Sequence, residues 1–195
     1  KDNQPAGPET ISGDFSVKAT IADASWAENA SIALYHSAGD AVVSDGEFKL
    51  SGDVFKGSLA EAIEDGKEYE WIAVSPYTAG AELSAYPVEL DGTAAPLFGK
   101  VKAAASKTAA PEIAMTSLAA FAKVNVKNST TAAIEVSSAS ITAPESEKIA
   151  GKFTVDLTAA APALKAVEAS NVAAYTGNVE VKAGETAEIV FAVAP

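Results

Sequence analysis

Alternation of apolar and polar residues over short stretches is the feature that most constrains the fold of this chain. From Phe15 to Ile21 every second residue is apolar, and the residues between them are polar. A period of two places the apolar side chains on one face of a β-strand, whereas an amphipathic helix needs a period of 3.6. The stretch therefore predicts a strand with one buried face.

Similar stretches recur along the chain and are separated by turn signals such as Asp45-Gly46, Asp65-Gly66 and Asp91-Gly92. Many short strands with this punctuation are typical of an all-β sandwich or barrel. We expect an all-β fold of about seven or more mostly antiparallel strands. The further strands are expected at residues 31–35, 46–50, 53–55, 69–74, 122–126, 134–136, 140–142, 152–157, 179–181 and 187–193.

One short helix is expected near residues 59–65. Ser58 and Glu61 have the spacing of a capping box, in which each side chain accepts a hydrogen bond from the backbone N–H of the other residue. Gly66 then supplies a residue that can end the helix in a left-handed conformation. A helix of about two turns can only plug a sheet or cross over it.

The chain has 195 residues and is expected to form one folded domain behind a flexible tether. Residues 1–12 are mostly polar and contain two prolines, which favours a tether. Residues 13–195 are then the β-sandwich domain. At this length a compact fold buries about 70% of the surface of the extended chain, so it needs neither disulfides nor metal for stability.

Charge and composition exclude several classes of function. The formal net charge is −12, and the basic residues form no cluster, so we expect no nucleic acid and no anionic lipid as partner. The chain lacks cysteine, which excludes disulfides and thiolate chemistry. No apolar run is long enough for a membrane-spanning helix, so any membrane attachment would come through a lipid anchor that this chain does not contain.

His36 is the one histidine of the chain, so any catalysis or metal binding by an imidazole would depend on it. It lies where an expected strand gives way to a turn, which is typical of a surface histidine. The segment from Asp40 to Glu47 has acidic residues without the spacing of a calcium loop. We therefore expect no metal, no cofactor and no catalytic residue.

Two functions other than a purely structural role are compatible with the sequence. Paired carboxylates could serve a glycosidase, although the acidic residues of 61–70 lie at polar faces and turns, where solvated side chains are expected. A group of aromatic residues could either fill a core or stack on sugar rings, which would make the chain a surface glycan-binding module. The aromatic residues in question are Tyr69, Trp71, Tyr77 and Tyr86.

The order of several segments resembles the fimbrillin or Mfa-like proteins, which are surface fimbrial and adhesion subunits of Gram-negative anaerobes. A tryptophan-led segment is followed by an aromatic–proline step, then by a methionine before an apolar strand that ends in asparagine, and finally by a β-β unit with a glycine in its second strand. The resemblance covers residues 13–157. The matching residues are Trp26, Asn29, Ile32, Leu34 and Tyr35; Tyr86-Pro87; Pro96 to Gly99; Met115, Leu118, Phe121, Lys123, Val124, Val126 and Asn128; and Ile134 to Val136, Ile141 and Ile149 to Phe153.

This resemblance implies a transthyretin-like β-sandwich, export as an outer-membrane lipoprotein, and assembly or adhesion at the cell surface. The polar start of the chain is similar to the tether that follows a lipidated cysteine. Family members usually carry a second sandwich after the first, so the resemblance implies that residues 13–195 are the N-terminal domain, with either a second domain missing or a compact variant of the family. Stalk subunits of the family are matured by cleavage after an arginine. This chain has no arginine, which favours an accessory, tip-like or stand-alone adhesin.

The function expected from these observations is non-catalytic adhesion or fimbria assembly. Partners would be other fimbrial subunits, or surface proteins or glycans of the host or of bacteria. The physical mechanism would be β-strand addition, in which an extended segment pairs with an exposed sheet edge. Strands near the two chain ends are the expected pairing segments, with the candidate residues Phe15, Val17, Ile21, Ile189, Phe191 and Val193.

Overall fold

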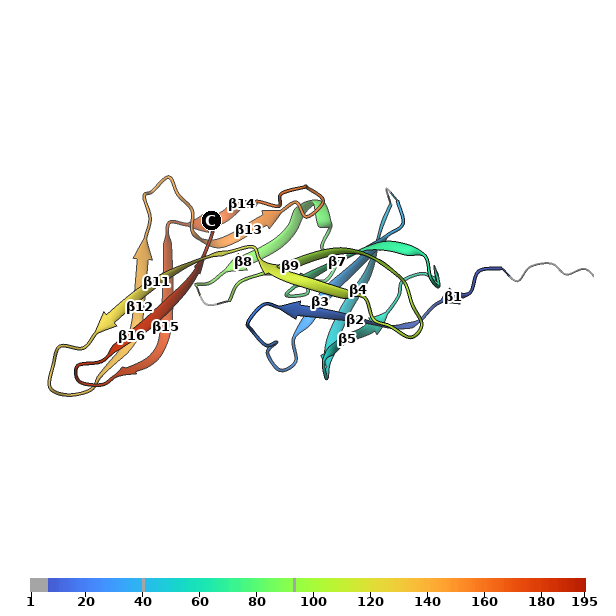
Figure 1. Cartoon of the computed structure of the whole chain (residues 1–195). Helices are drawn as coiled ribbons and strands as arrows, with labels where there is room; N and C mark the ends of the chain where they lie inside the picture. The colour runs from blue at the N-terminus through green and yellow to red at the C-terminus, as the bar shows by residue number, and fades with distance from the viewer. Residues whose placement is uncertain (1–6, 40, 93) are drawn as a thin grey trace, which may run out of the picture. The chain divides into compact units, whose positions relative to one another are not determined.

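The computed structural model describes residues 7–39, 41–92 and 94–195. The chain is nearly all β and mostly antiparallel, which confirms the expected fold class (Figure 1). Contacts between residues divide it into two compact units, of which the first contains Lys1–Gly80 and Leu97–Thr116 and the second contains Ala81–Pro96 and Ser117–Pro195. The sequence predicts a single domain at residues 13–195, and the limits of that domain stay a prediction.

The first unit is a closed barrel of seven strands in the order β10-β2-β5-β4-β3-β7-β9. The pair β2–β10 is parallel, whereas β2–β5, β4–β5, β3–β4, β3–β7 and β7–β9 are antiparallel. Two further short strands, β1 and β6, pair with each other. The bounds are β1 (Thr10–Ile11), β2 (Asp14–Ile21), β3 (Ser31–Ser37), β4 (Val42–Ser51), β5 (Val54–Ser58), β6 (Ile63–Glu64), β7 (Glu68–Ser75), β9 (Leu97–Ala104) and β10 (Glu112–Ser117).

Aromatic and branched side chains fill the barrel. The alternation predicted for β2 is confirmed, because Phe15 and Val17 point into the core. Phe15 stacks on Trp71 with ring centroids 5.0 Å apart, and Trp71 has no exposed surface. The indole N–H of Trp71 donates to the carbonyl oxygen of Ala103 at 3.1 Å, so the polar atom of this buried ring is satisfied.

The helix expected near residues 59–65 is wrong. This segment runs from β5 to the short strand β6, which pairs with β1. Leu59 and Ile63 are both buried in the barrel core, so they anchor a non-helical segment instead of one face of a helix. The N–H of Ala60 donates to the carboxylate of Asp45 on β4 at 2.9 Å, a tertiary bond in place of the expected local cap.

The described part of the expected tether is partly folded. Residues 1–6 lie outside the described residues, but Thr10–Ile11 form β1. The Ile11 side chain is buried against the barrel core, which gives this strand an apolar anchor. Strand structure in the described chain therefore begins before residue 13.

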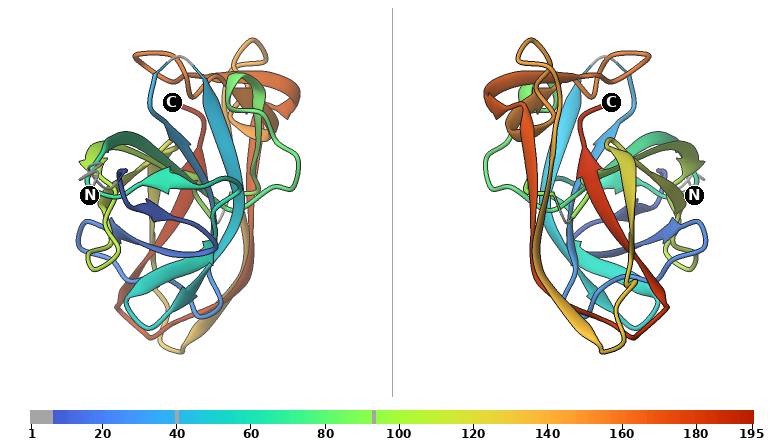
Figure 2. Two further views of the ribbon diagram at one scale, coloured as in Figure 1. Left: turned by 90° about the vertical axis from the view of Figure 1, so that its right-hand side faces the viewer. Right: turned by 90° about the vertical axis from the view of Figure 1, so that its left-hand side faces the viewer.

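The second unit consists of three small sheets, β11–β16, β12–β15 and β14–β13–β8. Ile189 and Phe191 of β16 are buried against Ala173 of β15, so the sheets β11–β16 and β12–β15 form two layers over a shared core. Figure 2 shows β11 in yellow beside β16 in red. The bounds are η1 (Leu83–Ala85), β8 (Tyr86–Leu90), β11 (Ala120–Lys127), β12 (Ile134–Thr142), β13 (Ala150–Val155), β14 (Leu164–Ser170), β15 (Val172–Val181) and β16 (Thr186–Val193).

The helical content of the described residues is small. The one helical element among them is the 3-10 turn η1. No helix in the described part of the chain has the length and apolarity that a membrane crossing requires.

Candidate functional site

A groove of about 790 Å³ lies beside the first half of β2. It is lined by Asp14 and Ser16 of β2, by Lys56 and Ser58 of β5, and by residues 106–110, which connect β9 to β10. The pairing of β2 explains why the groove lies at this place.

Strand β2 has different neighbours along its two halves. From Asp14 to Val17 it pairs with β5, and from Lys18 to Ile21 it pairs with β10 on the opposite side. No other strand of the described chain pairs with residues 14–17 on the β10 side. This leaves the first half of β2 with one open edge inside an otherwise closed barrel.

Proline ends the β2–β10 ladder. The N–H of Lys18 donates to the carbonyl oxygen of Pro111 at 2.9 Å. Peptide groups two residues apart in a strand point the same way, so the N–H and C=O of Ser16 point toward the groove. The next bond of the parallel ladder would require an N–H on residue 111, and proline has none. The backbone of Ser16 is therefore available to a partner strand.

The second half of β2 is closed on its other side by a side chain. Beyond Val17, where the pairing with β5 ends, the indole N–H of Trp26 donates to the carbonyl oxygen of Ala19 at 2.7 Å. The Trp26 ring also packs edge-on against Phe55 at 4.9 Å between ring centroids. The open part of β2 is thus confined to the residues beside the groove.

Segment 106–110 is held at its start by polar contacts. The N–H of Lys107 donates to the Asp65 carboxylate at 3.1 Å, and its ammonium group donates to the Glu9 carboxylate at 2.7 Å. The hydrogen bond from Lys107 lowers the pKa of Glu9, and the same bond raises the pKa of Lys107. These contacts fix one end of the groove wall.

The side chains of the expected pairing residues of β2 point into the barrel core. Phe15 and Val17 are buried in the core, and Ile21 packs partly buried against it. The backbone of Ser16, between two of these predicted residues, carries the open hydrogen-bonding groups. Alternation locates the strand, whereas Pro111, about 95 positions later in the chain, is the signal for its open edge.

The expected residues of β16 also face inward. Ile189, Phe191 and Val193 are buried in the core of the second unit. β16 pairs with β11 along its whole length. On the other side of β16, the described chain forms an isolated β-bridge between Ala192 and Gly92. The remainder of that edge is a second surface where a strand could pair.

The aromatic residues proposed for glycan stacking do not form an exposed platform. Tyr69 and Trp71 are buried in the barrel core, and Tyr86 is buried in the second unit. Tyr77 is half-buried and belongs to the first unit. Three of the four rings therefore cannot stack on a sugar in this structure.

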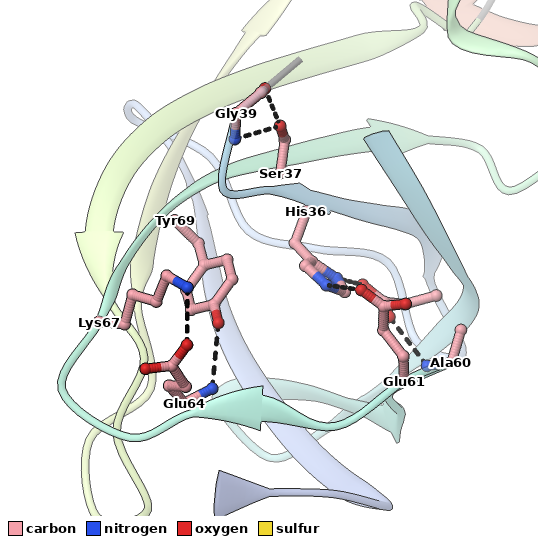
Figure 3. A network of polar contacts seen from close by, with 9 residues as sticks. His36, Ser37, Gly39, Ala60, Glu61, Glu64, Lys67 and Tyr69 are labelled. Carbon is pink, nitrogen blue, oxygen red and sulfur yellow. Dashed lines mark hydrogen bonds and ion pairs between the residues drawn. The ribbon is translucent and has the colours of Figure 1, made fainter. Parts of the chain in front are cut away.

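A second polar site surrounds His36, which is buried and not at the surface as expected. His36 is on the same face of β3 as Ile32 and Leu34, which are in the barrel core, so the imidazole lies inside the barrel with only 1% of its surface exposed. Its ring lies 5.6 Å from the Tyr69 ring and 5.7 Å from the Trp71 ring. Figure 3 shows the imidazole pointing toward the residue 60–61 segment.

A β-bulge brings a carboxylate to His36. Leu34 pairs with Gly46 but Tyr35 pairs with Ser44, so Asp45 is the extra residue on β4. The Asp45-Gly46 pair, expected to be a turn, is therefore a bulge within one strand, and bulges can redirect a side chain. The Asp45 carboxylate has no exposed surface and lies 2.7 Å from Nδ1 of His36.

The other ring nitrogen of His36 faces Glu61. Nε2 is 3.7 Å from the nearer Glu61 carboxylate oxygen and has no hydrogen-bond partner among the described residues. A pocket of about 280 Å³ is lined by His36, Glu61 and Tyr69. The Tyr69 hydroxyl accepts a hydrogen bond from the N–H of Glu64 at 3.0 Å and so holds the adjoining segment (Figure 3).

The segment from Asp40 to Glu47 contains further acidic residues. Asp40 lies outside the described residues, and the Asp45 carboxylate is engaged by His36 and by the N–H of Ala60. Within the described ranges, no group of three or more His, Asp or Glu side chains is placed to hold a metal ion.

Comparison with known proteins yields a likeness of fold. No protein-family model matches the chain, and no curated protein matches its sequence. The fold is similar to the crystal structure of a candidate cell adhesion protein from Bacteroides uniformis, with a TM-score of 0.55 and 16% identity, covering 92% of this chain and 74% of that one. A candidate cell adhesion protein from Bacteroides ovatus gives a TM-score of 0.56 and 11% identity, covering 93% of this chain and 78% of that one.

Proposed function

We propose that this chain is a non-catalytic adhesion protein of the cell surface, of fimbrillin-like type, which binds its partners by β-strand addition. The proposal is supported by the sequence resemblance to the fimbrillin family. It is also supported by the two similar crystal structures, each of which is of a candidate cell adhesion protein. The observation that carries the mechanism is the open edge of β2 at Ser16, beside a groove of about 790 Å³.

In the proposed mechanism an extended segment of another subunit lies in the groove and pairs with β2. The N–H and C=O of Ser16 supply main-chain hydrogen bonds, which are independent of the partner's side chains. The open stretch is short, so the side chains that line the groove, including Lys56 and Ser58, contribute the remaining contacts. Binding of this kind needs no metal, cofactor or catalytic group.

We propose that a strand from another fimbrial subunit occupies the groove beside β2. A second copy of this chain is the partner with which this pairing can be tested directly. A cell-surface location is part of the same proposal and is supported by the similarity to candidate cell adhesion proteins. Glycan stacking is not part of the proposal, because Trp71 is fully buried.

Substitution at Ser16 tests the proposal with little change to the barrel. Ser16→Pro removes the N–H that faces the groove and leaves the pairing with β5 intact, whereas Ser16→Ala keeps that N–H. We expect Ser16→Pro to abolish self-association measured by sedimentation velocity under assembling conditions, and Ser16→Ala to associate as the unchanged chain does.

Circular dichroism and thermal unfolding check that both variants fold. Association of folded Ser16→Pro at the level of the unchanged chain would contradict the proposed site. An unchanged chain that stays monomeric at millimolar concentration would contradict pairing between copies.

A further inference from the structure

The Nε2 atom of His36, in the buried pair His36–Asp45, has no hydrogen-bond partner among the described residues. A carboxylate has no proton to donate, so the contact between Asp45 and Nδ1 of His36, at 2.7 Å, places the hydrogen on Nδ1. In the neutral ring Nε2 then carries a lone pair. It faces a Glu61 carboxylate oxygen 3.7 Å away, which is also an acceptor. Two acceptors that face each other require a donor or a positive charge between them.

We propose that Nε2 of His36 and the carboxylate of Glu61 bind a divalent transition-metal ion of the zinc class, with water in the remaining positions. Zinc binds imidazole nitrogen and carboxylate oxygen at about 2.0 to 2.2 Å, so two ligand atoms can lie up to about 4.2 Å apart across one ion. The separation of 3.7 Å between Nε2 and the Glu61 oxygen fits such an ion at an open angle.

Asp45 has the position of the outer carboxylate that commonly accompanies a metal-binding histidine. Such a carboxylate accepts the hydrogen of the other ring nitrogen, fixes the tautomer and orients the ring. The backbone N–H of Ala60, at 2.9 Å from its second oxygen, holds Asp45 in turn. Asp45 is therefore a positioning residue, and His36 and Glu61 are the ligands.

Access to the site is through Glu61. The His36 side chain is 2% exposed, whereas the Glu61 side chain is 60% exposed and can swing aside to admit an ion from the pocket. No third ligating side chain is placed there among the described residues, so the coordination sphere stays open to water or to a donor atom from a partner. Such a site differs from a closed structural zinc site, which has four protein ligands.

The metal site is independent of the strand-pairing proposal. None of the residues that line its pocket lines the groove beside β2. Failure of one proposal therefore leaves the other unaffected, and metal binding can be measured on the monomeric chain.

The composition makes the test specific. His36 is the one histidine, and cysteine is absent, so any imidazole–metal bond in this protein belongs to a single residue. We would titrate the chelator-treated full chain, labelled with ¹⁵N at histidine, with Zn²⁺. The readouts are the two ring-nitrogen signals by NMR and the affinity by calorimetry. We expect one ion to bind per chain and a shift of the Nε2 signal.

Four variants separate the roles of the residues. Glu61→Gln should weaken Zn²⁺ binding at least about tenfold, and His36→Gln should abolish the Nε2-linked binding. Asp45→Asn should weaken it by about ten- to a hundredfold, as is usual for outer-shell partners. Glu64→Gln is the control, because Glu64 is paired with Lys67 at 2.7 Å, and it should bind as the unchanged chain does.

The exposed Glu61 carboxylate makes Glu61→Gln informative even if the His36 and Asp45 variants fold poorly. Equal Zn²⁺ affinity in Glu61→Gln and in the unchanged chain would overturn the proposal. An Nε2 signal that does not move while Zn²⁺ binds elsewhere, or an absence of Zn²⁺ binding, would overturn it as well.

Discussion

The backbone N–H of Lys18 donates a hydrogen bond of 2.9 Å to the carbonyl oxygen of Pro111, and the parallel ladder between β2 and β10 begins there. The missing N–H of Pro111 prevents the ladder from continuing to Ser16. Pro111, which directly precedes β10, therefore leaves the edge of β2 open beside the groove. The proposed strand addition depends on this relationship.

Replacing that proline should extend the ladder. Pro111→Ala supplies an N–H that the carbonyl oxygen of Ser16 can accept, so we expect the groove to narrow and self-association to fall, with no loss of thermal stability. Hydrogen exchange of the new amide at position 111 is the direct measurement. Exchange of that amide at the rate of an unstructured peptide would show that the ladder does not extend.

The barrel core should depend strongly on one indole. Trp71 is fully buried and stacks on Phe15 at 5.0 Å, so Trp71→Ala creates a large cavity. We expect the free energy of unfolding to fall by about 3 to 5 kcal/mol in denaturant titrations. The exposed Val42→Ala, in the same unit, should change it by less than about 0.5 kcal/mol. Similar losses in both variants would contradict the assigned core.

The carboxylate of Asp45 should stabilise the barrel as well as position His36. Asp45→Ala leaves both Nδ1 of His36 and the N–H of Ala60 without their partner, at 2.7 and 2.9 Å in the unchanged chain. Leaving a buried polar group unsatisfied costs about 1 to 3 kcal/mol, and denaturant titration should show a loss of that order. The matched control is the exposed Asp53→Ala, for which we expect almost no change.

The ion pair between Glu9 and Lys107 gives a pH dependence with a defined sign. The hydrogen bond from Lys107 lowers the pKa of Glu9 below its ordinary 4.5, so the contribution of Glu9 to stability is complete above 4.5 and is lost as the pH falls through the lowered value. The pKa of Lys107 is raised above 10.5, so its contribution is complete below 10.5 and is lost as the pH rises through the raised value.

NMR titration of the Glu9 side chain checks this prediction. The midpoint should lie below 4.5 in the unchanged chain and return toward 4.5 in Lys107→Gln. Both groups are exposed, so the effect on total stability should be small and should decrease with added salt. An unchanged midpoint in Lys107→Gln would contradict the pair in solution.

Local pattern located many of the strands, but it predicted none at β8, β9, β10 or β14. The alternation from Phe15 to Ile21 corresponds to β2 at Asp14–Ile21, because side chains on one face of a strand must meet the core every second residue. The same reasoning failed at residues 59–65, where tertiary contacts replaced the local cap. Leu59 and Ile63 are four apart, as in a helix, but each is buried separately against the barrel.

The candidate sites depend on contacts between distant residues, so the sequence could not predict them. Asp45-Gly46 has the residues of a turn, and only its pairing with β3 shows that it is a bulge that directs Asp45 toward His36. The open edge of β2 likewise requires the register between Lys18 and Glu112, which no local pattern contains. The fold class follows from periodicity, whereas the sites follow from register.

Hydrogen exchange of the Ser16 amide, measured in the free and in the self-associated chain, tests the central claim most directly. Strand addition predicts fast exchange of this amide in the monomer and strong protection in the assembly. The amide of Val17, which faces β5, should be protected in both. An assembly in which the Ser16 amide exchanges as fast as in the monomer would contradict strand addition at β2.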